Sequence, residues 1–192
     1  AEPNLCDSDS ASEYYRTWKR HIRGNTKFAN VKDLTASAVA ASINRLYAQT
    51  DVSKGGTGNS RPGGYLLYES ITADDASRTV TIVCKNPTFN MPGILAYPYF
   101  AIIDTSVADK EIIGTGPYKV DKFTPGISVA VSRNKHYWNG DVPYDTATII
   151  FIDDSSTKAM ALKAGDVDLV ENITTASDLE AFAADKAYYI ST

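Results

Sequence analysis

A change of periodicity between two segments constrains the fold of this chain more than any other feature. In residues 36–48, apolar side chains recur at helical spacing behind an N-cap at Thr35. Residues 79–84 read Thr-Val-Thr-Ile-Val-Cys, an alternation of β-branched residues that predicts a strand with one buried face. The sequence therefore predicts a mixed α/β fold with both a helix and a sheet in its core.

The remaining elements extend this pattern in both directions. Residues 65–71 are the predicted hairpin partner of 79–85. Residues 17–23, with Trp18 and Ile22 on one face, predict a half-buried or edge strand. The prolines after residue 86 leave room for at most one short helix between Met91 and Tyr97. Further strands are predicted at residues 118–123 and 127–132.

From residue 146 onward, the pattern predicts strands that alternate with helices. The continuous apolar run 146–152 is typical of a strand buried on both faces. A helix over 157–164, capped by Ser155 or Ser156, should end at Gly165. Strands at 167–170 and 188–192 would flank a second helix that starts at the capping box Ser177–Glu180 and ends near residue 186. This order favours a βαβ-type arrangement with parallel strand pairs.

Composition excludes several classes of protein. The 192 residues include 19 Lys and Arg against 23 Asp and Glu, a balance that argues against nucleic acid as a partner. The longest uncharged apolar stretch, residues 91–103, is too short to cross a bilayer and contains prolines. Two cysteines supply neither a disulfide scaffold nor a zinc tetrad.

The motif inventory favours no enzyme and no cofactor. His21 and His136 have no nucleophile in a recognisable elbow, so we interpret them as structural or surface residues. The pair Asp153-Asp154 is more simply explained as a helix cap than as an acid–base dyad. Neither Gly55–Gly58 nor Gly114–Gly116 matches a phosphate-binding loop, and no local group of metal ligands is present. We therefore predict no catalytic residue, no metal and no cofactor.

Three ordered segments resemble one known family. The first is Trp18–Phe28 with the helix segment Leu34–Arg45, and the second is Gly114-Thr115-Gly116-Pro117-Tyr118. The third is Arg133-Asn134-Lys135-His136-Tyr137-Trp138-Asn139-Gly140, followed by Ala161–Asp168. Together they are similar to motifs of the family-5 extracellular solute-binding proteins of ABC transporters, which bind oligopeptides, dipeptides and nickel.

The resemblance implies a partial fold of the periplasmic-binding-protein type II kind. A small α+β lobe would occupy residues 1–112, and residues 113–192 would form part of domain I. It also implies that the chain is the first part of a longer protein, without the first strands and the second lobe. The fragment would then expose apolar surface through which it could self-associate.

The implied function is solute binding outside the cytoplasm. The protein would bind a peptide or a similar small molecule, as a periplasmic protein or a cell-surface lipoprotein, and deliver it to an ABC transporter permease by hinge closure. Alternatives in the same family are a nickel or other metal chelate, a sugar or an opine. Nickel-type relatives have an Arg-rich stretch where this chain has Ala96–Phe100, which weakens the chelate alternative. A stand-alone extracellular interaction module is the alternative from a different class.

Aromatic residues are the remaining candidates for ligand contact. Tyrosine offers both an apolar ring and a polar hydroxyl, a combination that suits a peptide-like ligand. The predicted ligand-binding residues are Arg61, Tyr65, Tyr97, Tyr99 and Phe100. Cys6 and Cys84 lie in predicted strands of a protein that the resemblance places outside the cytoplasm, so they form either a disulfide or two free thiols.

Overall fold

The computed structural model describes residues 5–12, 14–48 and 66–191. Contacts divide the chain into two compact units. Unit 1 comprises Ala1–Asp121 and Val131–Ala147, and unit 2 comprises Lys122–Ala130 and Thr148–Thr192. The mixed α/β class is confirmed, whereas the predicted domain boundary after residue 112 stays a prediction.

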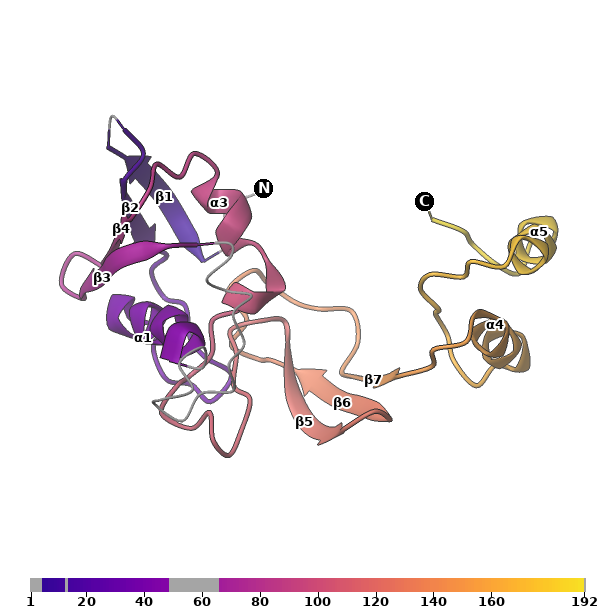
Figure 1. The fold of residues 1–192 in the computed structure, drawn as a ribbon. Coiled ribbons are helices and arrows are strands. Elements are labelled where there is room, and N and C mark those ends of the chain that lie inside the picture. The colour runs from indigo at the N-terminus through magenta and orange to yellow at the C-terminus, as the bar shows by residue number, and fades with distance from the viewer. Residues whose placement is uncertain (1–4, 13, 49–65, 192) are drawn as a thin grey trace. The chain divides into compact units, whose positions relative to one another are not determined.

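Unit 1 contains a four-stranded antiparallel sheet (Figure 1). Its strands lie in the order β1 (Cys6–Ala11), β2 (Thr17–Ile22), β4 (Thr79–Cys84) and β3 (Tyr68–Asp74). Each neighbouring pair is antiparallel, and β3 and β4 form the predicted hairpin. Because β2 pairs with strands on both sides, it is an internal strand, and the edge alternative for residues 17–23 is wrong. Its half-buried character is confirmed.

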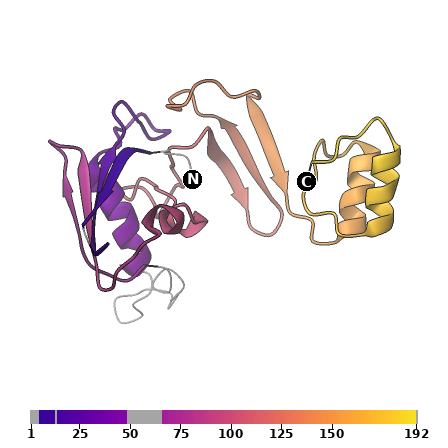
Figure 2. The ribbon, with the colours of Figure 1, turned by 90° about the horizontal axis from the view of Figure 1, so that it is seen from above.

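Helix α1 (Ala36–Ala48) has the predicted bounds and packs along one face of this sheet, against β3 and β4 (Figure 2). The hydroxyl Oγ1 of Thr35 accepts a hydrogen bond from the N–H of Ala38 at 3.1 Å, so the predicted N-cap is confirmed. The helix stripe and the sheet face share one core with the segments on either side. Its fully enclosed members include Ile22, Phe28, Leu34, Ile43, Val80, Ile82 and Met91.

Short helices follow the sheet. Helix α3 (Met91–Leu95) is the single short helix that the prolines permit, and Asn90 caps it by accepting from the N–H of Gly93 at 3.2 Å. The 3-10 helix η2 (Pro98–Phe100) comes next. The chain then forms a bridge between Ile103 and Gly114, which brings it back toward the core.

A three-stranded sheet of order β5 (Tyr118–Thr124), β6 (Ser128–Arg133) and β7 (Thr146–Ile150) follows. The first two strands agree with prediction, and β7 begins at the predicted residue. However, every residue of β7 is exposed, so the prediction of burial on both faces is wrong for this structure. An apolar run is buried only when other layers cover it, and the run itself does not specify those layers.

Helices α4 (Ser155–Ala164) and α5 (Ala176–Ala184) of unit 2 lie side by side (Figures 1 and 2). Lys163 joins them, with Nζ 3.6 Å from Oδ1 of Asp178 and 5.0 Å from the ring centroid of Phe182. Gly165 ends α4 at φ 78°, the left-handed conformation that its position predicts.

Three predictions for unit 2 are wrong. The N-cap of α4 is Asp154, whose Oδ1 accepts from the N–H of Thr157 at 2.7 Å, and not Ser155 or Ser156. Helix α5 begins before the predicted capping box, with Thr175 as its N-cap. In the described chain, residues 167–170 and 188–191 form no strand, because no neighbouring strand pairs with them. The βαβ arrangement is therefore absent from the described residues.

Candidate functional site

A hollow of about 750 Å³ lies within unit 1 and is lined by residues of β1, β2 and β4 of the four-stranded sheet. Apolar side chains from the sheet and from α1 form its floor: Ile22, Val80, Ile82, Val39 and Ile43. Residues 92–103 and 112–120 supply the other walls. A mostly apolar concavity of this size is typical of a small-molecule site.

The predicted aromatic residues divide between the rim and the core. Tyr97 lines the hollow and is 45% exposed, whereas Phe100 also lines it but is only 3% exposed as part of the core. Tyr99 is not among the lining residues, although its ring stacks on Tyr97 at 6.3 Å between centroids and 6° between planes. Arg61 and Tyr65 lie outside the described residues. Ligand contact by these five residues stays a prediction.

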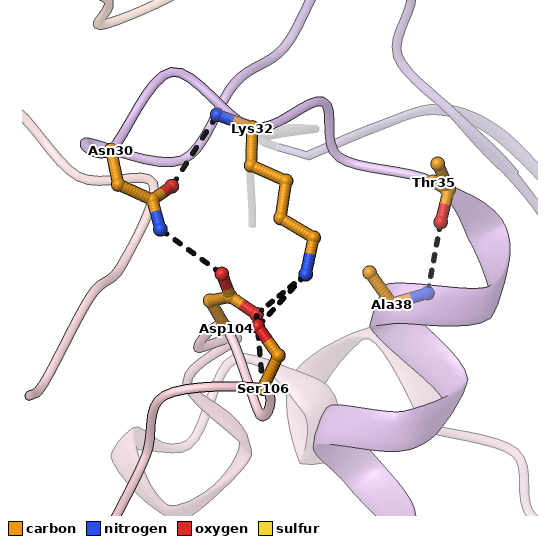
Figure 3. A network of polar contacts seen from close by, with 6 residues as sticks. All are labelled: Asn30, Lys32, Thr35, Ala38, Asp104 and Ser106. Carbon is orange, nitrogen blue, oxygen red and sulfur yellow. Dashed lines mark hydrogen bonds and ion pairs between the residues drawn. The ribbon is translucent and has the colours of Figure 1, made fainter. Parts of the chain in front are cut away.

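A polar network holds the wall formed by residues 112–120. The carboxylate of Asp104 accepts hydrogen bonds from Nδ2 of Asn30 at 3.1 Å, from Nζ of Lys32 at 3.0 Å and from Oγ of Ser106 at 2.7 Å (Figure 3). The N–H of Asp104 in turn donates to the carbonyl of Ile113 at 2.8 Å. The network therefore ties the connection between β2 and α1 to the segment that enters the wall.

The electrostatics of Asp104 follow from these contacts. Its side chain is buried, and burial alone would raise the pKa of the carboxyl group. Hydrogen bonds from Ser106, Asn30 and Lys32 outweigh that effect, so the pKa lies well below its usual range. Asp104 is therefore a stably charged anchor, and its neighbours compensate the charge.

Asn134 fastens the other end of the same wall. Its backbone N–H donates to the carbonyl of Pro117 at 2.8 Å, and its Nδ2 donates to the carbonyl of Gly116 at 2.8 Å. Its Oδ1 accepts from the N–H of His136 at 2.9 Å, which orients the turn that carries Tyr137 into the lining. The sequence motifs Gly114–Tyr118 and Arg133–Gly140 are thus in direct contact, and both contribute residues to the lining of the hollow.

Four charged residues line the hollow, and two of them, Asp7 and Lys119, have close partners. Nδ1 of His21 lies 2.6 Å from Oδ1 of Asp7, and Nζ of Lys119 lies 2.8 Å from Oδ1 of Asp121. The remaining pair is Arg20 and Asp9, with Nη1 3.5 Å from Oδ2. The sequence analysis did not single out Arg20, although its position midway between Trp18 and Ile22 placed it on the same face of the strand.

Cys6 and Cys84 are free thiols in the structure and form no disulfide with each other. Cys6 pairs with Ile22 at one end of β2, whereas the N–H of Cys84 bonds to the carbonyl of Arg16 beyond the other end. Arg16 and Ile22 are six residues apart along the extended chain, which corresponds to about 20 Å between the positions of the two cysteines. Bonded cysteines need Cα atoms within about 7 Å, so the Cys6–Cys84 disulfide does not form here.

Within residues 5–12, 14–48 and 66–191, no three His, Cys, Asp or Glu side chains gather closely enough to hold a metal ion. In the same ranges, no helix is long and apolar enough to cross a membrane.

The site is thus an apolar hollow at a four-stranded sheet that α1 backs. Comparison with known proteins gives the family. The model of the bacterial extracellular solute-binding proteins, family 5 (middle), matches residues 1–192, and the chain belongs to this family.

Individual relatives support the same assignment. The chain is 30% identical over 172 residues to the glutathione-binding protein GsiB of Escherichia coli K12, covering 84% of this chain and 32% of that protein. It is 28% identical over 156 residues to the nickel-binding protein NikA of Staphylococcus aureus, covering 79% of this chain and 29% of that one. The crystal structure of a nickel ABC transporter protein from Bacillus halodurans superimposes with a TM-score of 0.81 at 29% identity, covering 96% of this chain and 36% of that chain.

The chain spans about a third of the length of these relatives. Their agreement confirms the predicted type II solute-binding fold in partial form. The family comprises bacterial extracellular solute-binding proteins, and the relatives are named as binding proteins for nickel and for glutathione.

Proposed function

We propose that this chain belongs to the substrate-binding component of an ABC importer and binds a peptide or a similar small organic solute. The family match over residues 1–192 carries this proposal. The hollow supports an organic solute, because apolar walls gain free energy by covering carbon surface and offer little to a bare ion.

The proposed mechanism is closure of two lobes on the solute. Unit 1 supplies an apolar wall, and the remainder of the full-length protein supplies the opposing lobe. Closure buries the solute without breaking a bond, and the closed form docks on the membrane permease. The protein acts outside the cytoplasm, either free in the periplasm or as a lipoprotein on the cell surface.

A nickel complex is the second candidate, because two of the similar proteins are named for nickel. Calorimetric titration of the full-length protein with tripeptides, with glutathione and with nickel–histidine complexes separates the candidates. We expect micromolar or tighter binding of a tripeptide. Binding of nickel complexes alone would reject the peptide proposal.

Tyr97 provides a site-directed test, since it lies at the rim of the hollow. The variant Tyr97→Ala removes a ring that would stack on the solute, so we expect at least tenfold weaker peptide binding. Tyr144→Ala is the matched control, because Tyr144 is an exposed tyrosine that does not line the hollow. Equal affinity in the two variants would show that the hollow is not part of the peptide site.

A further inference from the structure

We propose that Arg20 is a carboxylate-binding residue inside the hollow, so that the preferred solute has an apolar body and an anionic end. The proposal rests on the function proposed above and adds the chemical class of the solute. It starts from the position of Arg20 in β2, between Trp18 and Ile22 on the covered face of an internal strand. The side chain of Arg20 is only 14% exposed, although the residue is charged.

The guanidinium group of Arg20 is incompletely satisfied. Its Nη1 reaches Asp9 at 3.5 Å, which is the long limit of a hydrogen bond. Its Nε is buried and has no hydrogen-bond partner among the described residues. A buried N–H without an acceptor is unfavourable, so a rotation of the side chain that turns Nε toward an acceptor in the hollow would be stabilised.

The geometry of arginine favours a carboxylate as this acceptor. Nε and one Nη form an edge of the planar group that binds both oxygens of a carboxylate at once. The pairing with Asp9 goes through Nη1 alone, so it does not use this two-point arrangement. A solute carboxylate would bind more strongly than Asp9, after a small rotation of the Arg20 side chain.

The other charged lining residues do not compete for the same role. Lys119 lies 2.8 Å from Asp121, and Asp7 lies 2.6 Å from His21. The charge of Lys119 is therefore compensated by Asp121, and the carboxylate of Asp7 already has a hydrogen-bond partner in His21. Apart from Asp9 on β1, the nearest neighbours of Arg20 on this face of the sheet are apolar, with Ile22 two residues along the strand and Val80 opposite it on β4. Weak screening by such walls strengthens a charge-assisted hydrogen bond.

A pair of probes that differ only in charge tests this proposal. An N-acetylated leucine–phenylalanine–leucine tripeptide is titrated by calorimetry into the full-length protein, once with a free C-terminal carboxylate and once as the C-terminal amide. We expect the free acid to bind at least tenfold more tightly than the amide. Arg20→Leu should remove that preference, so that the acid and the amide bind this variant with equal affinity.

Two further variants serve as controls. Arg20→Lys keeps the charge but not the two-point geometry, so it should retain only part of the preference for the acid. Lys19→Gln removes an exposed cation from the opposite face of β2 and should leave the preference unchanged. Equal binding of acid and amide to the wild type, or an acid preference that survives Arg20→Leu, would overturn the proposal.

A second pair of probes separates this inference from the peptide proposal. If neither tripeptide binds, 4-phenylbutyrate and 4-phenylbutyramide are compared by NMR titration. A preference for the acid that depends on Arg20 would support the carboxylate role of Arg20. It would reject only the proposed binding of peptides. Absence of binding by all four probes would overturn both.

Discussion

The variant Asp104→Asn tests the network that holds the wall of the hollow. Asp104 is 2% exposed and accepts four hydrogen bonds, two of them from the backbone and side chain of Ser106. The substitution keeps the shape of the side chain and removes its charge. Any loss of stability therefore measures the charged hydrogen bonds rather than packing.

The expected loss of unfolding free energy is the sum of the contributions of Ser106, Asn30 and Lys32. The two bonds from Ser106 change from charged to neutral, which costs about 1 kcal/mol each. The new amide nitrogen faces the amide of Asn30, so one buried donor loses its acceptor, at a cost of about 1 kcal/mol or more. The ammonium group of Lys32 is about half exposed and returns to water, so its contribution is less than about 1 kcal/mol. The variant should lose about 3 kcal/mol of unfolding free energy.

Tryptophan fluorescence during urea unfolding is a suitable assay. Trp18 and Trp138 are the only two tryptophans of the chain, and both belong to unit 1. With a denaturant slope near 2 kcal/mol per molar, the midpoint should fall by about 1.5 M. Asp109→Asn changes an exposed carboxylate of the same segment and should leave the midpoint unchanged. A shift no larger than that of the control would refute the reasoning.

The pH dependence supplies an independent check. Because the folded-state pKa of Asp104 is below its unfolded value near 3.9, its charge stabilises the fold above about pH 4. As the pH falls below about 4, the carboxyl group takes up a proton in the unfolded chain while it stays charged in the folded protein, so this contribution is lost progressively as the pH approaches the lower folded-state pKa. The stability difference between wild type and Asp104→Asn should therefore shrink in acid. A difference that stays constant from pH 7 to pH 3 would contradict the account.

Two further predictions concern α1 and unit 2. Thr35→Ala removes the hydrogen bond to the N–H of Ala38 and should lower the free energy of unfolding, measured in urea, by about 1 kcal/mol. Thr35→Ser keeps the hydroxyl group and should lower it little, so equal losses in the two variants would argue against capping. Because Ile149, Ile150 and Phe151 are exposed in unit 2, the 192-residue chain should self-associate with rising concentration. Light scattering should show less association for Phe151→Lys, and a chain that is monomeric at every concentration would disprove this.

Local sequence patterns predicted the elements whose stability depends on their own residues. The stripe and cap of α1 determine its bounds because both features lie within one helix. The hairpin β3–β4 and the left-handed Gly165 follow from turn chemistry in the same way. The family assignment also came from the sequence, since the three motifs follow one another in order along the chain.

The candidate site was only partly predictable. Tyr97 was identified as an aromatic residue beside prolines, and the structure places it at the hollow. Arg20 was missed because a charged residue between two apolar ones in a strand is normally assigned to the surface. The alternation that placed Trp18 and Ile22 inward applied equally to Arg20, and that signal was sufficient to find it.

The sequence alone determined the class of fold, the family and the local elements, because each depends on neighbouring residues or on ordered motifs. Only the tertiary structure decided which apolar surfaces are covered and which distant residues meet. The register of β2 keeps Cys6 and Cys84 at opposite ends of a strand, and the absence of a covering layer leaves β7 exposed in the described chain. Pairing register and layer contacts join residues far apart in the chain, and no local pattern encodes them.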